Sequence, residues 1–465
     1  MPRVSVILPS LNVGRYIKET LESVCNQTLK DIEIICVDAG SIDGTLEIIE
    51  EYCNRDSRVQ LVHSERKSYG YQMNLGIEKA VGEYIGIVET DDHIDSKMYE
   101  SLYLTAKENN LDIIKSNYRF FFEGSDGERL FICSDLSREN GFEYNAIFSS
   151  KDYISGKYIN EIYIWDGIYR TSFLREKNVK FNESPGASFQ DFGFRYLTNL
   201  QVERMMIIND AFYNYRKDNL EASTYNTRTV NFILEEVCYV REKLFDKLHN
   251  NEEMYQLLVR EAVEAFRSSY RELIRWRDPD DNVRNAINGF VELIRSFIED
   301  NVFTIETIGM YNWKLMQLMI QDPELFMNST RIMLKAEADN ATDFIKNCSK
   351  ANQIVIFGSG AYGKAALTFL RACGEGEKVV AFADNNPNVV GKEMYGVKVI
   401  APEDAAYNNK NSLYVIASPS NSVAMRKQLR GLGIEDSDVV VYNYSSSIFT
   451  CASGINIYKA EKEQK

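Results

Sequence analysis

Short apolar runs alternate with amphipathic stretches along the first 115 residues. Between these runs, apolar residues recur at helical spacing, as Ile17, Leu21 and Val24 do. The strand-like runs are VSVIL from Val4, IEIICV from Ile32, VQLVH from Val59 and YIGIV from Tyr84. This alternation predicts an α/β domain with a mostly parallel sheet flanked by helices.

The pattern changes twice farther along the chain. Residues 116–224 are irregular and rich in aromatic side chains, which indicates an appended half that faces the substrate. Long helical patterns follow, and strand and helix patterns return near residue 350. We therefore expect an N-terminal domain, a helical accessory region, a second α/β domain and a terminal tail. Their expected bounds are 1–225, 226–348, 349–447 and 448–465.

The second α/β domain opens with IVIFGSGAYGKAALTFL, which reads as a strand, a glycine loop and a helix. Gly358, Gly360 and Gly363 have the GxGxxG spacing, and Asp384 ends the next strand 21 residues later. This arrangement predicts a Rossmann-like parallel α/β domain and is typical of a dinucleotide site. The same glycines also allow a helix to pack closely on a strand. NAD, a nucleotide-sugar and no ligand therefore all stay open.

Charge and composition exclude several classes of protein. The formal net charge of −15 argues against a general nucleic-acid binder, which presents a basic field. The eight cysteines are scattered without a CxxC pair, which indicates reduced thiols. A strand pattern begins at Val4, which leaves no room for a signal peptide, and no apolar run approaches the roughly 18 residues of a membrane span. We expect a cytoplasmic protein.

Acidic residues crowd the end of the fourth apolar run. The stretch YIGIVETDDHID places Glu89, Asp91 and Asp92 within four residues. Because strand ends of an open parallel sheet share one rim, these acids are expected to meet the turns at Asn12 and Asp38. The chain has only three histidines, and oxygen ligands alone suit Mg²⁺ or Mn²⁺ shared with substrate phosphates.

Two long blocks resemble family 2 glycosyltransferases of the GT-A fold. They are VSVILPSLNVGRYIKETLESVCNQTLKDIEIICVDAGSIDGT and GYQMNLGIEKAVGEYIGIVETDD, and the resemblance covers residues 4 to about 224. The second block ends at the position of the family's Asp-x-Asp motif. The resemblance implies a GT-A nucleotide-diphospho-sugar transferase fold. It also implies inverting transfer of a sugar from a nucleotide-sugar, expected to be a UDP-sugar, to an acceptor hydroxyl.

The resemblance implies a donor site along the strand ends. Pro9 and Asp38 frame the nucleotide base, with Asp38 accepting a hydrogen bond from the ring N–H of uracil. Asn12 belongs to the Pro-x-x-Asn turn of this site. Arg66 either assists the nucleotide or is an ordinary exposed basic residue. Ala39 stands where the family has a second acid, so one ribose or base contact is expected to be lost.

The resemblance also implies a site for the diphosphate and its metal. Glu89 and Asp91 take the two acidic positions of the motif, with Glu in place of the usual first Asp. Asp91 is expected to ligate Mn²⁺ or Mg²⁺, and Asp92 is close enough in sequence to share that role. Arg216, in YNYRKDNLEAST, is expected to reach the diphosphate. His93 is either a bystander or a further ligand.

The acceptor side carries the expected catalytic base. The segment FNESPGASFQDFGFRYLTNL resembles the family's acidic pair before a helix, with Gln190 in place of the first acid. Asp191 is therefore the expected base, and a helix N-cap is the alternative interpretation. Trp165, in IYIWDGIYRTSFL, either stacks under a sugar or belongs to the core.

The implied partners are a nucleotide-sugar donor and a glycan or lipid-linked glycan acceptor in cell-surface polysaccharide synthesis. This implies work at the inner face of the cell membrane, where peripheral association and homo-oligomers stay open. Two other functions also stay open. The C-terminal domain could carry the activity as an oxidoreductase or regulatory module, or the departures at Ala39, Glu89 and Gln190 could mark an inactive binding protein.

Overall fold

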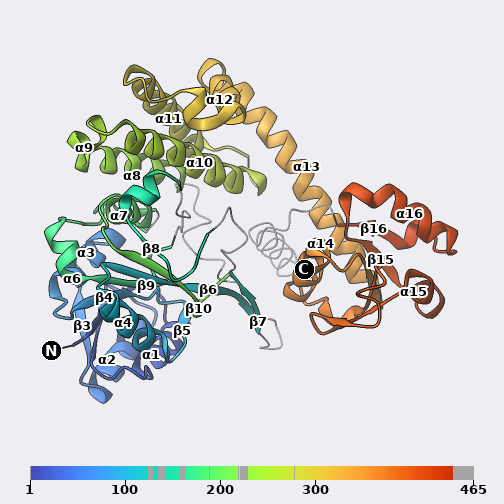
Figure 1. Ribbon diagram of the computed structural model, residues 1–465, viewed down its shortest axis with the longest axis horizontal. Helices are drawn as coiled ribbons and strands as arrows, with labels where there is room; N and C mark the ends of the chain where they lie inside the picture. Colours follow the sequence, from blue (N-terminus) through green and yellow to red (C-terminus); the bar gives the residue numbers. More distant parts are fainter. Residues whose placement is uncertain are drawn as a thin grey trace. The chain divides into compact units, whose positions relative to one another are not determined.

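The computed structural model describes residues 2–123, 129–134, 142–156, 163–187, 189–217, 219, 229–276 and 278–442 (Figure 1). The expected tail, residues 448–465, lies outside these ranges. The chain forms two compact units. The first comprises Met1–Phe120 and Phe131–Ser329, and the second comprises Phe121–Leu130 and Thr330–Lys465.

A mixed sheet forms the centre of the first unit. Within the described residues its strand order is β3-β2-β1-β4-β9-β6-β10-β5, with β7 on β6 and β8 on β10. The strands β1 to β4 are parallel neighbours, as the alternating pattern predicts, and β9 continues the sheet antiparallel to β4. Their bounds are β1 Val4–Ser10, β2 Ile32–Asp38, β3 Val59–His63, β4 Tyr84–Ile87, β5 His93–Ile94, β6 Ile113–Glu123, β7 Arg129–Cys133, β8 Ile147–Phe148, β9 Gly167–Arg170 and β10 Met205–Arg216.

The central strand β1 brings the functional loops together. All seven of its residues are buried, as is usual for a parallel strand covered by helices on both faces. Ser10 is in register with Asp38 of β2, and Ile7 is in register with Ile87 of β4. The turns that follow β1, β2 and β4 therefore start from one edge of the sheet.

Helices cover both faces of this sheet. In α3, a Cβ on Gly76 would lie 2.6 Å from Cγ2 of Ile7, so the missing side chain lets α3 pack closely on β1. The helices of this part are α1 Ile17–Cys25, α2 Thr45–Arg55, α3 Tyr69–Lys79, α4 Met98–Glu108, α5 Ser150–Ile154, α6 Thr171–Glu176 and α7 Gln190–Asn199.

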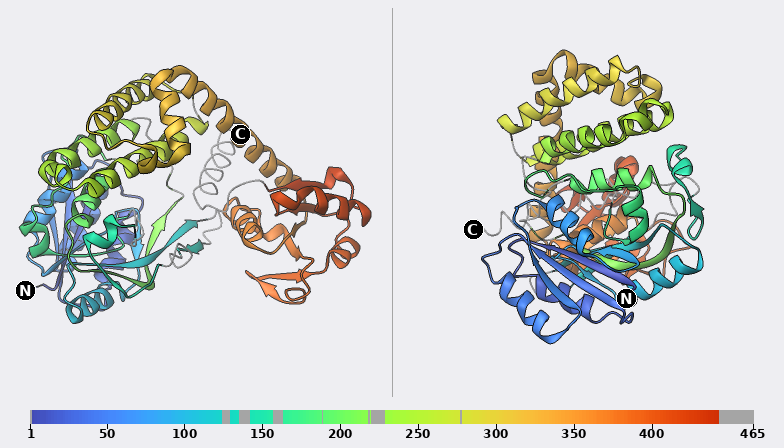
Figure 2. Two further views of the ribbon diagram at one scale, coloured as in Figure 1. Left: turned by 45° about the horizontal axis from the view of Figure 1, so that its top comes forward. Right: turned by 90° about the vertical axis from the view of Figure 1, so that its left-hand side faces the viewer.

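A layer of longer helices packs on α7 within the same unit. Figure 1 shows α8 next to α7, with α10, α11 and α12 farther out in the same layer, and Figure 2 shows the layer from two further sides. Ile233, Val237 and Val240 of α8 have no solvent exposure, so the apolar face of α8 lies inside the layer. The bounds are α8 Thr229–Lys243, α9 Phe245–His249, α10 Glu252–Trp276, α11 Asp281–Glu299, α12 Ile305–Gln321 and α13 Pro323–Lys350.

The first compact unit thus extends through these helices to Ser329. The expected division at residues 225, 348 and 447 stays a prediction. No helix among the described residues combines the length and the apolar character that crossing a membrane requires.

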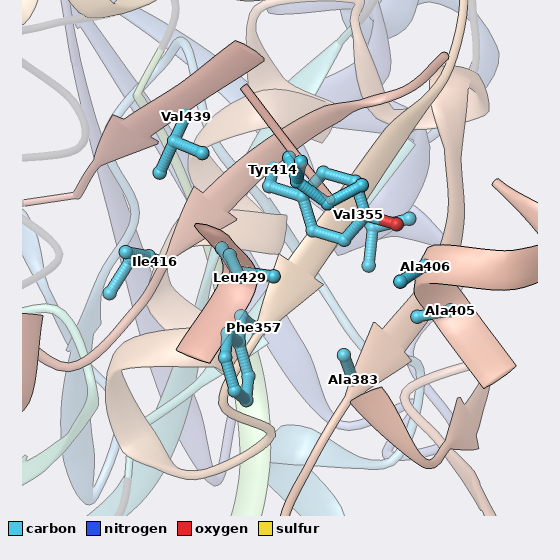
Figure 3. Packing of buried hydrophobic residues seen from close by; sticks show 10 residues of the cluster. Val355, Phe357, Ala383, Ala405, Ala406, Tyr414, Ile416, Leu429 and Val439 are labelled. Carbon is cyan, nitrogen blue, oxygen red and sulfur yellow. The ribbon is translucent and has the colours of Figure 1, made fainter. Parts of the chain in front are cut away.

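The second unit is built on a six-stranded sheet within the described residues, in the order β13-β14-β12-β11-β15-β16. All neighbours but β13 and β14 are parallel, and this order is that of a doubly wound sheet. Figure 3 shows its core, where Phe357 of β11 and Tyr414 of β15 pack with Leu429. The bounds are β11 Ile354–Phe357, α14 Ala361–Ala372, β12 Val379–Ala383, β13 Glu393–Met394, β14 Val397–Ile400, α15 Pro402–Asn408, β15 Leu413–Ile416, α16 Ser422–Gly431 and β16 Val439–Val441.

Candidate active site

The turns after β1 and β2 are joined by hydrogen bonds. The backbone N–H of Asn12 donates to Oγ of Ser41 at 2.8 Å, and the N–H of Ile42 donates to Oδ1 of Asn12 at 3.0 Å. The turn after β4 is attached as well, because Oγ1 of Thr90 donates to the carbonyl oxygen of Pro9 at 2.9 Å. The structure therefore places Pro9 and Asn12 at the expected edge of the sheet.

Asp38 is fully buried at the end of β2 and holds the turn that follows it. Its Oδ1 accepts hydrogen bonds from the N–H groups of Gly40 and Ser41 at 2.8 and 2.9 Å. Its Oδ2 accepts from Oγ of Ser41 at 2.5 Å. A carboxylate has about four acceptor positions, so the turn uses most of them. Contact between Asp38 and a uracil ring stays a prediction.

The acidic residues after β4 lie in a shared, half-buried environment. Oε1 of Glu89 accepts a hydrogen bond from the Tyr69 hydroxyl at 2.6 Å, and Oδ2 of Asp91 accepts from Nδ2 of Asn219 at 2.8 Å. Burial raises the pKa of Glu89 to about 8, and the negative charges of Asp91 and Asp191 add to this rise. Burial also raises the pKa of Asp91, although the Asn219 bond acts in the opposite direction.

Asp92 is only 1% exposed and connects the acidic turn to β10. Its Oδ1 accepts from the backbone N–H of Arg216 at 2.7 Å, and its Oδ2 accepts from the Tyr213 hydroxyl at 2.8 Å. Burial raises its pKa well above the usual range, with repulsion from Asp91 as a second cause. This geometry gives Asp92 a positioning role, and its expected place among the metal ligands stays a prediction.

Arg216 lies at the end of β10 directly beside the acidic turn. Its Nε donates to the carbonyl oxygen of Asp91 at 3.0 Å, and its Nη2 lies 3.0 Å from Oε2 of Glu19. The guanidinium also covers the ring of Tyr16, 4.8 Å from its centre. The positive charge is therefore next to the expected diphosphate position, although the side chain is only 4% exposed and held by protein groups.

Arg66 and Trp165 each have two alternative interpretations, and the structure shows what surrounds their side chains. Arg66 is exposed, pairs with Glu183 at 3.0 Å and covers the ring of Tyr71. Trp165 is 5% exposed and stacks on Tyr213, with 4.0 Å between ring centres. The surroundings of Trp165 are those of a core residue, and its contact with a sugar stays a prediction.

Asp191 lies in the first turn of α7, with Phe189 at the N-cap position. The N-cap interpretation of Asp191 is therefore wrong, because the helix begins one residue before it. Its half-buried carboxylate accepts from the N–H of Phe192 at 3.0 Å through Oδ1. Burial raises the pKa of Asp191, and the charge of Arg195 acts in the opposite direction. A raised pKa improves a carboxylate as a general base near neutral pH.

Backbone pairing ties the acceptor segment to the donor side. The N–H of Tyr69 donates a hydrogen bond to the carbonyl oxygen of Gly186 at 2.9 Å. The N–H of Gly186 in turn donates to the carbonyl oxygen of Lys67 at 2.9 Å. Nε2 of Gln190, a side chain that is 1% exposed, donates to Oγ of Ser184 at 3.0 Å. Burial is the main reason why the pKa of Tyr69 is raised, and the negative charges of Glu89 and Asp191 raise it further. Glu89 and Asp191 therefore both lie near Tyr69.

Sequence reasoning missed the residues that arrange these acids. The Tyr69 hydroxyl binds Glu89, and the Tyr213 hydroxyl binds Asp92. Asn219 binds Asp91, and Glu19 binds Arg216. Tyr69 directly precedes the block GYQMNLGIEKAVGEYIGIVETDD, and Tyr213 opens the segment YNYRKDNLEAST, but a hydroxyl's partner depends on the packing of distant segments.

The residues present fit a divalent cation that is shared with a phosphate-bearing substrate. In the part of the chain that the structure describes, no three His, Cys, Asp or Glu side chains form a ready metal cage. A cation bound chiefly by substrate phosphates needs only one or two protein carboxylates. Glu89 and Asp91 supply such oxygens, and their mutual repulsion would fall once a cation bound beside them.

A separate cavity of about 330 Å³ lies in the second unit, lined in part by Gly358, Gly360 and Asp384. Oδ2 of Asp384 accepts from the N–H and Oγ of Ser359 at 2.8 and 2.6 Å. Asp384 therefore holds the glycine loop, where a dinucleotide site would direct it to a ribose. A Cβ on Gly363 would overlap the carbonyl oxygen of Gly358, so packing alone explains this glycine.

Residues 5–176 match the family model described as Glycosyl transferase family 2. The glycosyltransferase GlyG of Streptococcus pneumoniae is 34% identical over 220 residues, which cover 46% of this chain and 70% of GlyG. This chain belongs to glycosyltransferase family 2.

Two further proteins resemble parts of the chain. The uncharacterized glycosyltransferase EpsJ of Bacillus subtilis is 31% identical over 223 residues. That match covers 47% of this chain and 62% of EpsJ, which is less than two thirds of its length. The structure of S. aureus TarS 1-349 in complex with UDP-GlcNAc has a TM-score of 0.50 at 17% identity, covering 73% of this chain and 92% of that one. At this identity the likeness shows a common fold.

Proposed function

We propose that the chain is a metal-dependent inverting glycosyltransferase that moves a sugar from a UDP-sugar to an acceptor hydroxyl. The observation that carries this proposal is the grouping of Asp191 with Glu89 and Asp91 beside the carboxyl ends of β1, β2 and β4. Open α/β sheets bind ligands at that edge. Family membership supports the same class of reaction, and the UDP-GlcNAc complex of TarS supports the expected nucleotide.

In this proposal, the donor's diphosphate lies over the acidic turn. Asp91, with Glu89 beside it, would hold a divalent metal ion, which would supply positive charge for the leaving diphosphate when bound. Arg216 adds a fixed positive charge next to Asp91. Asp92 keeps the turn attached to β10 through Tyr213.

Asp191 acts as the general base. It takes the proton from the acceptor hydroxyl while that oxygen attacks C1 of the sugar from the face opposite the diphosphate. The bond from C1 to the diphosphate oxygen breaks in the same step, so the anomeric configuration inverts. Base assistance of this kind is typically worth about 10²–10⁴ in rate. The proposed acceptor is a glycan or lipid-linked glycan of the cell surface.

Calorimetric titration with UDP, GDP and CDP tests this function. Each nucleotide is added once with Mn²⁺ and once with EDTA. We expect UDP to bind with Mn²⁺ and to lose most of its affinity in EDTA, because the carboxylates around Asp91 repel an unaccompanied diphosphate. Tighter binding of GDP or CDP would change the donor. Absence of binding by all three nucleotides would contradict the proposal.

The cavity in the second unit favours a second candidate function, which is binding of NAD or a nucleotide-sugar. Its place at the carboxyl ends of β11, β12 and β15 is where such ligands bind in doubly wound sheets. Titration with NAD and UDP-sugars after Asp91→Asn substitution separates this cavity from the donor site. Binding that survives Asp91→Asn supports the second candidate.

A further inference from the structure

A buried carboxyl group from the helical layer lies against the helix that carries Asp191. Glu236, on α8, has no solvent exposure. Its Oε1 accepts a hydrogen bond from Nδ2 of Asn182 at 2.8 Å. Its Oε2 is buried without a hydrogen bond of full geometry in the described part of the chain, and the amide of Gly193 is the backbone donor that acts on this carboxyl group. A buried acceptor without a partner is costly, and the cost is greatest when the group is charged.

The backbone of α7 is shaped to admit this carboxyl group. Gly193 lies two residues after Asp191, and a Cβ on Gly193 would overlap Oε2 of Glu236. Helices α7 and α8 contact each other directly. The missing side chain at position 193 therefore gives Glu236 its place beside the first turns of α7.

The surroundings of Glu236 oppose its ionisation. Burial raises its pKa to about 8, and the negative charges of Asp191 on α7 and Glu235 on α8 add to the rise. The hydrogen bond from Asn182 and the amide of Gly193 act in the opposite direction. Tyr239, one turn farther along α8, is itself harder to ionise because of burial and the charge of Glu236. With a pKa of about 8, Glu236 is therefore mostly uncharged at neutral pH.

We propose that Glu236 is a positioning residue for Asp191, and that only its uncharged form holds α8 against the first turns of α7. This inference rests on the proposed function, in which Asp191 is the base. Ionisation would place a second, unpaired negative charge inside the contact. Because such a charge is costly in a buried site, the contact weakens and Asp191 loses its position.

The test compares pH profiles of wild type and Glu236→Gln. The Gln side chain is uncharged at every pH and still accepts from Asn182. In wild type we expect kcat to fall about tenfold from pH 7 to 9, since roughly a tenth of Glu236 stays protonated one unit above its pKa of about 8. In Glu236→Gln we expect this alkaline fall to disappear. The same fall in both proteins would overturn the proposal.

Urea unfolding at several pH values gives a readout that needs no substrate. The folded pKa of Glu236 is raised above that of the unfolded chain, so its contribution to stability is present at acid pH and is lost as pH rises toward about 8. The wild-type midpoint should fall over this range relative to that of Glu236→Gln. Equal pH dependence of the two midpoints would overturn the proposal even if no donor were turned over.

Two further variants separate positioning from general loosening of α8. Tyr239→Phe removes the hydroxyl that donates to the carbonyl oxygen of Lys180 at 3.0 Å, and it should keep the wild-type pH profile. Gly193→Ala pushes the carboxyl group of Glu236 out of its buried place, so the alkaline fall should move to lower pH. An altered profile in Tyr239→Phe, or an unchanged one in Gly193→Ala, would contradict the role of Glu236.

Failure of the proposed function looks different from failure of this inference. A wild-type protein without transfer to any acceptor and without donor hydrolysis contradicts glycosyl transfer, and the urea profiles still report the titration of Glu236. A working enzyme whose Glu236→Gln variant keeps both the alkaline fall and the wild-type urea profile contradicts the role of Glu236 alone.

Discussion

Each acid at the edge of the first sheet has a role set by its hydrogen-bond partners. Asp38 and Asp92 are buried, and both oxygens of each accept bonds from neighbouring protein groups. Asp91 and Asp191 are half-buried, with fewer bonds to the protein. The structure thus separates carboxylates that hold loops from carboxylates available to a substrate or metal.

The first prediction concerns Asp191. Asp191→Asn should lower kcat by about 10²–10⁴ because an amide cannot take the acceptor's proton. The calorimetric affinity for UDP with Mn²⁺ should stay at the wild-type value, since Asp191 has no part in donor binding. Asp91→Asn is the matched comparison and should weaken UDP binding and remove its dependence on Mn²⁺. Wild-type turnover in Asp191→Asn would show that another group is the base.

The acids themselves could be recognised from the sequence, because they stand in short motifs with fixed spacing. The division of labour among them could not. It depends on the hydroxyl of Tyr213, 121 residues from Asp92, and on Asn219, 128 residues from Asp91. Glu236 carries no motif, and its position against Gly193 appears only once α8 packs on α7.

At the scale of elements, α7 is held by a buried carboxylate of α10 and a buried hydroxyl of α5. Arg195 of α7 is 3% exposed, and its Nη1 and Nη2 both donate to Oε2 of Glu261 on α10 at 3.2 Å. The Tyr153 hydroxyl donates to Oε1 of Glu261 at 3.0 Å. The helix that bears the proposed base is therefore fixed by the helical layer as well as by the sheet.

Glu261→Gln should be strongly destabilising. Removing one member of a buried ion pair leaves the other charge uncompensated, which costs about 3–5 kcal/mol. Urea denaturation measures the change, and kcat should fall together with stability because α7 carries Asp191. Glu292→Gln is the control: its partner Arg295 lies at 2.5 Å on an exposed face of α11, where such pairs contribute about 0–1 kcal/mol. Equal losses in both variants would contradict the role assigned to Arg195 and Glu261.

The elements were largely predictable because apolar periodicity is strong in both α/β parts and in the long helices. The contacts between these helices and strands were harder to predict from the sequence. The change of pattern near residue 226 reflects longer helices, whereas the packing of α8 on α7 continues one compact unit to Ser329. A change in apolar periodicity along the sequence therefore marks a change in the type of secondary structure. It does not show where one hydrophobic core ends, because that depends on contacts between elements.

At the scale of the whole chain, two compact units suggest separate responses to substitution. Gly363→Ala should destabilise the second unit by about 1–3 kcal/mol, because a Cβ there overlaps the carbonyl oxygen of Gly358. Gly360→Ala is the control, since a Cβ at that position meets no other described part of the chain within 4 Å beyond its two neighbours in sequence. Urea unfolding of Gly363→Ala should show one shifted unfolding transition. Calorimetric titration of the same variant should show unchanged affinity for UDP. A parallel loss of UDP affinity in Gly363→Ala would show that the two units depend on each other.

The contact between α8 and α7 restricts how this chain could be recombined with its relatives. The sequence resemblance to family 2 glycosyltransferases covers residues 4 to about 224, which makes that position an attractive crossover point for building chimeras. A crossover there would keep Asn182 and Gly193 but present them with a foreign helix in place of Glu236. Exchange of specificity between family members is therefore better attempted with the segment through Ser329 as a single cassette.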